Sequence, residues 1–437
     1  MSAHPSFLAV RGEVVHFTAD PAEQGESACE HIPDGLLVIS DGHVLHCGPA
    51  NALLPNLPTD ARHFDYRGKL ILPGFIDTHT HYAQTAALAS HGEQLTAWLE
   101  KYTFPAERQF ANPAHAAAEA NFFCDQLLRN GTTTAMAFAT VHPASVDAIF
   151  AAAHARQMRL IAGKVLMDRN CPAYLHEDAD TGDAHTRALI EKWHGRARLA
   201  YAVTPRFVPT STPEQLRRIG RLLADIPGLY LQSHLAEQRA EVAWVAKLHP
   251  EARSYLDVYE RHGLLGARSL YAHCIWLDDE DRRRMALHGA AVSFCPTSNL
   301  FLGSGLFDLA RARQFGLRVG LGTDIGAGTS FSLLQTLNEA YKVLQLGGQT
   351  LTPEQGFYIA TLGGARALCL DEFIGSFAAG READFIVLDP KATPLLEYRM
   401  SRATTRTERL FVLMTLGDDR CVAATHILGE PASTRHT

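Results

Sequence analysis

The sequence lacks several features that would place it in a specialised class of protein. It has no uninterrupted apolar stretch long enough to span a bilayer. Its net charge is −7, from 40 basic and 47 acidic residues, and no basic run would attract a nucleic-acid backbone. Its eight cysteines form no C-x-x-C pair, which favours reduced thiols over a disulfide framework. We therefore expect neither a membrane nor a nucleic-acid partner.

The start of the chain also has neither a basic segment nor a sustained apolar core, so we expect no secretory signal. The expected location of the protein is therefore the cytoplasm. The composition, 46% hydrophobic and 20% charged, is that of an ordinary globular protein. The 437 residues exceed the usual size of one domain. A (β/α)8 barrel takes about 250 residues, which leaves room for a smaller second unit.

Both ends of the chain have the pattern of short strands. Near the N-terminus, Leu36–Ser40 and His43–His46 flank Asp41-Gly42, a favoured two-residue hairpin turn. We expect further strands at Asp384–Asp389, Leu410–Met414 and Cys421–Ile427. The pattern predicts a small β-sandwich domain built from both termini, residues 1–70 and 376–437.

The middle of the chain, residues 71–375, alternates short apolar runs with helical segments, which is typical of a parallel α/β fold. No G-x-G-x-x-G follows the first strand, which argues against a dinucleotide-binding sheet. Eight candidate strands favour a TIM-like (β/α)8 barrel. They are Gly74–His79, Thr132–Phe138, Leu160–Met167, Leu199–Pro205, Leu229–His234, Leu270–His273, Ala291–Phe294 and Arg318–Gly322; helices are expected at Pro113–Arg129, Thr212–Ala224, Glu237–Leu248 and Asp278–His288.

The most informative local feature is a pair of histidines, His79 and His81, at the end of the first barrel strand. Residues i and i+2 of a strand point to the same side, so both imidazoles can face one metal ion. Taken alone, the pair could equally be two polar residues that close a strand.

Further polar residues recur at other strand ends, where the active sites of such barrels lie. His234 ends the fifth strand and is followed by Glu237, His273 ends the sixth, and Asp324 follows the eighth. Histidine nitrogens and a carboxylate form a suitable shell for a divalent transition metal. Their recurrence favours metal binding over a structural role for each.

Around these positions the sequence resembles the amidohydrolase superfamily, and within it the enzymes that deaminate guanine. The resemblance covers about residues 70 to 390. It rests on Pro73–Gln84, Trp98–Glu107, Gly163–Asn170, Thr204–Phe207, Ser233–Glu237, Ala272-His273, Phe294–Asn299 and Gly322–Phe331.

The resemblance implies a role for each site residue. His79, His81, His234 and Asp324 would bind one zinc ion per chain, although iron or manganese would suit the same donors. Glu237, Asp324 and His273 would be catalytic: Glu237 as the proton shuttle, Asp324 as acceptor of a proton from water, and His273 by hydrogen bonding to that water or the substrate. Gln84, Arg206, Phe207 and His273 would bind the purine. The resemblance also implies a homodimer.

These residue types suit such chemistry. Arg206 is a forked, permanently charged donor for a purine carbonyl, Gln84 offers both donor and acceptor, and Phe207 offers a stacking face. Outside this context an arginine at a strand end would usually be a salt-bridge partner. Some superfamily members bridge two metals with a carboxylated lysine on the fourth strand. Here Lys164 falls on the third, and the fourth ends in Thr204-Pro-Arg206, so one metal is expected.

The resemblance therefore implies zinc-dependent hydrolysis of guanine to xanthine and ammonia. A related aminopurine or a pterin is the alternative substrate, because the width of the pocket does not follow from the sequence. A non-catalytic scaffold on the same fold is a remoter alternative, since fold alone does not fix function. Such a scaffold would be expected to lose ligands, and none of the expected residues is missing.

Overall fold

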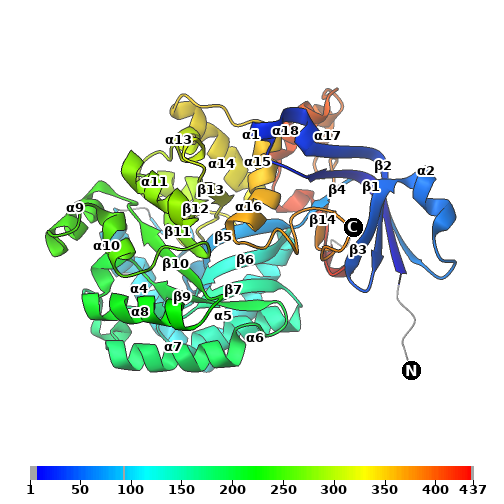
Figure 1. Cartoon of the computed structure of the whole chain (residues 1–437). Coiled ribbons are helices and arrows are strands. Elements are labelled where there is room, and N and C mark those ends of the chain that lie inside the picture. The colour runs from blue at the N-terminus through cyan, green and yellow to red at the C-terminus, as the bar shows by residue number, and fades with distance from the viewer. Residues whose placement is uncertain (1–6, 92–93, 435–437) are drawn as a thin grey trace.

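A computed structural model describes residues 7–91 and 94–434, which form a barrel and a β domain (Figure 1). Eight parallel strands pair in the order β13-β12-β11-β10-β9-β7-β6-β5. The backbone N–H of Asp324, after β13, donates to the carbonyl of His79 on β5 at 2.9 Å, so the two edges meet. The expected TIM-like barrel is confirmed. Its strands are β5 (Phe75–His81), β6 (Thr132–Phe138), β7 (Arg159–Gly163), β9 (Leu199–Pro205), β10 (Tyr230–Leu235), β11 (Ser269–His273), β12 (Ala291–Phe294) and β13 (Arg318–Leu321), with the short β8 (Val165–Leu166) paired to β9.

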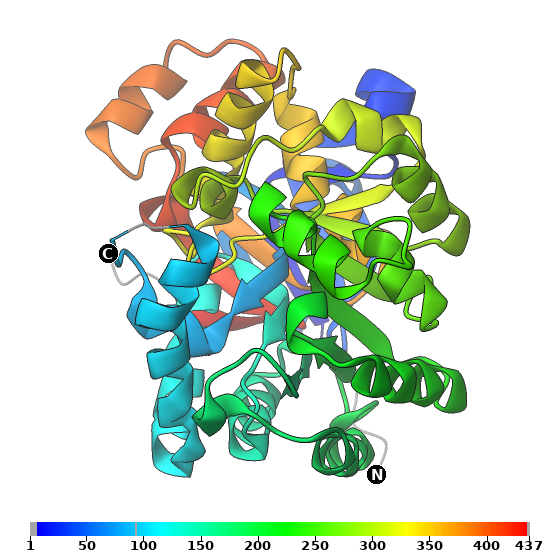
Figure 2. The same ribbon diagram turned by 90° about the vertical axis from the view of Figure 1, so that its left-hand side faces the viewer.

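Helices lie outside these strands in both views (Figures 1 and 2). The expected helix Pro113–Arg129 is α5: the side chain of Asn112 caps it, and Pro113 occupies the first turn, where a missing N–H costs least. The helices are α1 (Pro21–Gln24), α2 (Ala50–Leu53), α3 (Leu95–Trp98), α4 (Phe104–Arg108), α5, α6 (Pro143–Ala155), α7 (Ala179–Trp193), α8 (Pro213–Asp225), α9 (Arg239–Leu248), α10 (Tyr255–Arg261), α11 (Asp279–His288), α12 (Pro296–Phe301), α13 (Leu309–Gln314), α14 (Leu333–Leu346), α15 (Pro353–Ile359), α16 (Leu362–Ala367), α17 (Pro394–Met400) and α18 (Arg406–Leu416).

The β domain is one seven-stranded mixed sheet drawn from both ends of the chain, in the order β16-β15-β14-β4-β1-β2-β3. The expected hairpin is confirmed: Asp41 and Gly42 both have positive φ, 49° and 79°, the conformation that two-residue hairpin turns favour. The strands are β1 (Phe7–Phe17), β2 (Cys29–Ser40), β3 (His43–Pro49), β4 (Arg62–Pro73), β14 (Phe385–Leu388), β15 (Val422–Ile427) and β16 (Glu430–Thr434).

The prediction of one strand is wrong. Leu410–Met414 lies inside helix α18. Thr405 and Glu408 form a capping box that starts this helix, and Leu410, Leu413 and Met414 are buried along one face. The short apolar run fits a strand as well as a helix, and the capping residues before it decide between them.

The β domain leads directly into the first barrel strand. Strand β4 pairs antiparallel with β14 and passes through Gly74 into β5. A Cβ at Gly74 would lie 2.1 Å from the hydroxyl oxygen of Thr133, so only glycine allows β5 to approach β6 this closely. The division of the chain at residues 70 and 375 stays a prediction.

All eight cysteines are free thiols. Within residues 7–91 and 94–434, no helix has both the length and the apolar character that crossing a membrane requires.

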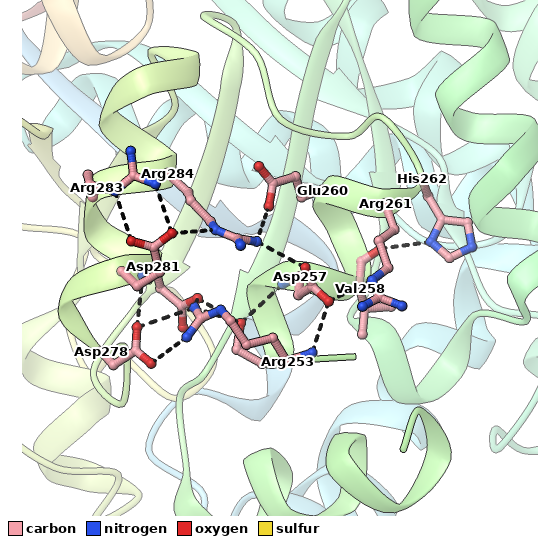
Figure 3. Close-up of polar contacts among 12 residues, drawn as sticks. Arg253, Asp257, Val258, Glu260, Arg261, His262, Asp278, Asp281, Arg283 and Arg284 are labelled. Carbon is pink, nitrogen blue, oxygen red and sulfur yellow. Dashed lines mark hydrogen bonds and ion pairs between the residues drawn. The ribbon is translucent and has the colours of Figure 1, made fainter. Parts of the chain in front are cut away.

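A network of charged side chains holds helix α10 against α11 (Figure 3). Asp257 on α10 accepts hydrogen bonds from Arg284 Nη1 at 3.0 Å and from the backbone N–H of Arg253 at 2.9 Å, and it pairs with Arg261 at 2.6 Å. Burial alone would raise the pKa of Asp257, but these contacts hold its pKa below the usual value. The helix matters for the barrel mouth, because the hydroxyl of Tyr259 donates to the carbonyl of His234 at 3.0 Å.

We predict that Asp257→Asn lowers the free energy of unfolding by about 1.5–3 kcal/mol, because a hydrogen bond to a charged group contributes more to stability than one between neutral groups. Glu430→Gln removes an ion pair with Arg62 in which both side chains are more than half exposed, and it should cost less than about 1 kcal/mol. Urea unfolding of both variants at equal metal content measures the difference. Equal losses in the two variants would contradict the prediction.

Candidate metal and purine site

Strand β5 places two imidazoles in the barrel mouth as its two-residue repeat predicts. His79 is 0% and His81 3% exposed. The Nε2 atom of His81 lies 3.2 Å from His79 Nε2, 3.3 Å from His234 Nε2 and 3.2 Å from Asp324 Oδ1. The structure therefore brings together all four of the expected metal ligands.

Buried hydrogen bonds fix the backbone around these ligands. Asp77 Oδ1 accepts from the N–H of His79 at 3.2 Å and from that of Thr323 at 3.0 Å, while its Oδ2 accepts from the hydroxyl of Thr323. Asp324 has a positive φ of 51°, in the left-handed region that aspartate adopts more readily than most other non-glycine residues. Asp77 thus ties β5 to the segment that presents Asp324.

The donor set fits a metal ion better than it fits hydrogen bonding alone. A histidine nitrogen carries at most one proton, so His81 Nε2 cannot satisfy three neighbours by hydrogen bonds. Donor atoms that share one zinc ion at about 2.0–2.1 Å are themselves about 3 Å apart. Burial lowers the pKa of His81 to about 3, which keeps the imidazole neutral, as a ligand must be. Burial would raise the pKa of Asp324, but the adjacent His79 holds it well below its usual range.

His273 and Glu237 lie beside these ligands. Asn299 Oδ1 contacts Nδ1 of His273 at 2.8 Å and turns its Nε2 toward the site. This Nε2 lies 3.6 Å from Glu237 Oε2 and 3.9 Å from Asp324 Oδ2. Glu237 also accepts a hydrogen bond from Ser304 at 2.8 Å. Burial raises the pKa of Glu237, so its carboxyl can hold a proton at a higher pH than an exposed glutamate.

A cavity opens onto these groups. Gln84, Arg206 and Phe207, the expected purine-binding residues, all line it, and so does Trp98. The segment that follows the first barrel strand thus contributes an aromatic wall. Phe104, from the same segment, lies under the guanidinium of Arg206, 5.3 Å from ring centre to Cζ.

Reasoning from the sequence gave no individual role to three buried polar residues. Asn299 orients His273, and Ser304 holds Glu237. Glu107 is 1% exposed and contacts both Arg206 and Gln84. The signal for Glu107 was a carboxylate at the end of an aromatic segment, Trp98–Glu107, which is an unusual place for an unpaired charge.

Lys164 takes no part in the site. It lies between β7 and β8, its side chain is buried, and its ammonium pairs with Glu177. The fourth barrel strand, β9, is followed by Arg206 and not by a bridging lysine.

Comparison with known proteins agrees with this geometry. A profile of the amidohydrolase family matches residues 70–432. The chain belongs to this family. The amidohydrolase is 50% identical over 431 residues to guanine deaminase from Escherichia coli K12, with 98% of each chain covered. It is 39% identical over 414 residues to a probable guanine deaminase from Deinococcus radiodurans, covering 93% of this chain and 94% of that one.

Two solved structures of such relatives have the same fold. The structure of E. coli guanine deaminase matches with a TM-score of 0.96 and 49% identity, over 98% of this chain and 100% of that one. Guanine deaminase from C. acetobutylicum, solved with guanine bound in its active site, matches with a TM-score of 0.88 and 29% identity, again over 98% and 100%.

We predict that the purified amidohydrolase holds one transition-metal ion per chain. His81→Asn should remove most of it, because His81 lies next to every other ligand. His63→Asn changes an exposed histidine of β4 and should leave the metal in place. Elemental analysis of the three proteins measures this. Two ions per active chain, or full activity without metal, would contradict the one-metal site.

Proposed function

We propose that this amidohydrolase hydrolyses guanine to xanthine and ammonia, with one zinc ion bound by His79, His81, His234 and Asp324. The observation that carries the proposal is the placement of Arg206 and Gln84 in the same cavity as this donor set and Glu237. Half of the residues are identical to those of a guanine deaminase along almost the whole chain, which supports the same conclusion.

The cavity suits the functional groups of guanine. Arg206 is a donor-only group and can hold the carbonyl at C6, while Gln84 can pair with the neighbouring ring N–H. Phe207 is 5% exposed and lines the same cavity, where it offers a face to a flat heterocycle. These contacts would direct the C2 amine toward Glu237 and His273.

A bound zinc ion supplies Lewis acidity that makes water nucleophilic near neutral pH. Asp324 and His273, with Oδ2 and Nε2 3.9 Å apart, can accept and stabilise the proton that this water loses. Glu237 can donate a proton to a ring nitrogen next to C2 and, once it has been reprotonated by a proton from the attacking water, can donate again to the departing amine. Its buried carboxyl, fixed by Ser304, is suited to hold that proton.

The proposal extends to the metal, the assembly and the range of substrates. Iron or manganese would suit the same ligands. We propose that the enzyme is a cytoplasmic homodimer, as the family resemblance implies. Deamination of a related aminopurine or a pterin is the second candidate activity, because the same donors could bind another fused ring with an amide edge.

The proposed activity is tested with the metal-loaded protein and a panel of guanine, adenine and pterin substrates, by measurement of ammonia release. We expect guanine to be preferred over adenine by about 10⁴-fold, because Arg206 would meet the C6 amine of adenine as donor against donor. Comparable kcat/KM values for guanine and adenine would contradict the assigned purine recognition. Ammonia release from none of the substrates would favour a non-catalytic scaffold.

We predict that Glu237→Gln keeps metal and guanine binding but lowers kcat by about 10²–10⁴-fold, the usual contribution of a general acid or base. Glu191→Gln removes an exposed carboxylate on α7 and serves as the control. Steady-state kinetics with metal analysis measures both. A Glu237→Gln variant with near-normal kcat would leave proton transfer to Asp324 and His273.

A further inference from the structure

Glu107 joins the two polar side chains among the expected purine-binding residues of the cavity, Arg206 and Gln84. Its Oε1 accepts from Arg206 Nη1 at 2.9 Å and from Gln84 Nε2 at 3.2 Å, and its Oε2 accepts from Arg206 Nη1 at 2.9 Å. All three residues are buried, with exposures of 1–3%. Glu107 itself does not line the cavity, so it acts on a ligand through Arg206 and Gln84.

The contact with Glu107 decides which end of the Gln84 amide is available. An ionised carboxylate can only accept hydrogen bonds, so the atom of Gln84 that faces it must be the NH₂ group. The carbonyl oxygen Oε1 then lies on the other side, against Gly326, where a Cβ would come within 2.2 Å of it. Gln84 lines the cavity, and within the described part of the chain this oxygen accepts no hydrogen bond, so it is available as an acceptor for a ligand.

We propose that Glu107 is a positioning residue that sets the hydrogen-bond polarity of the purine pocket. By holding Arg206 as a donor and Gln84 as an acceptor side by side, it selects a ring edge with a carbonyl next to an N–H. Guanine presents this edge at C6 and N1, whereas adenine presents the reverse, an amine next to an acceptor nitrogen. The Glu107 carboxylate also balances the charge of Arg206, which suits a neutral purine. This inference rests on the proposed function, because it assumes a purine ligand.

Glu107→Gln tests the proposal with almost no change of volume. The new amide has only one acceptor oxygen, and its NH₂ group would meet Arg206 or Gln84 as donor against donor. Gln84 can relieve the clash by turning its oxygen toward residue 107, which exposes its own NH₂ group to the N–H of guanine. Gln84→Glu combined with Glu107→Gln restores an acceptor at position 84 and should recover part of the lost affinity.

The measurement is equilibrium dialysis of metal-loaded protein in a Glu237→Gln background, so that guanine binds with little turnover. Glu107→Gln should raise the Kd for guanine about 10–100-fold, as expected when a buried donor loses its acceptor. 2-Aminopurine keeps the C2 amine but has neither the C6 carbonyl nor the N1 hydrogen, so its Kd should change less than about threefold. Glu100→Gln, an exposed carboxylate in the same segment, should change neither value.

A loss of guanine affinity with little change for 2-aminopurine, partly recovered in the double variant, supports the proposal. Equal losses for both ligands would show that Glu107 only maintains the shape of the pocket, and unchanged guanine binding would show that it has no role; either result overturns the proposal. Ammonia release by the unaltered protein is judged separately. If guanine binds with the predicted selectivity but is not deaminated, only the proposed function fails.

Discussion

The barrel mouth is organised around donor atoms that lie too close together to be satisfied by their own protons. Three other potential metal-binding atoms lie within 3.3 Å of His81 Nε2. One belongs to His79 on the same strand, and the other two belong to His234 and Asp324 at the ends of other strands. Such an arrangement is costly in a buried site unless a cation shares the donors. Much of the surrounding structure serves to hold it: Asp77 fixes the segment that carries Asp324, and Asn299 fixes His273.

A parallel barrel makes this convergence possible. Because all eight strands run the same way, residues far apart in sequence, such as His79 and Asp324, emerge at one end. The hydrogen bond from the Asp324 N–H to the His79 carbonyl closes the barrel at the same point where the ligands meet. Closure of the fold and assembly of the site therefore depend on the same few residues.

This geometry also explains what the sequence could predict. Strand periodicity and the positions of strand ends identify the candidate site residues His79, His81, His234, His273 and Asp324. The side of a strand to which a side chain points follows from its position along the backbone alone. The helix α18 was missed because a five-residue apolar run does not distinguish a strand from a buried helix face. The roles of Glu107, Asn299 and Ser304 depend on contacts between segments distant in sequence. Glu107 and Arg206, for example, are 99 residues apart, and no local pattern pairs them.

Arg206 connects the two halves of the site. Its carbonyl contacts Nδ1 of His234 at 2.7 Å, which fixes the ring that turns Nε2 toward the other ligands. Its side chain extends the other way, to Glu107 and the wall of the cavity. One residue thus orients a candidate metal ligand through its backbone and the proposed purine contact through its guanidinium. Because the backbone contact does not depend on the side chain, purine selectivity can vary at this position while the donor set for the metal stays intact.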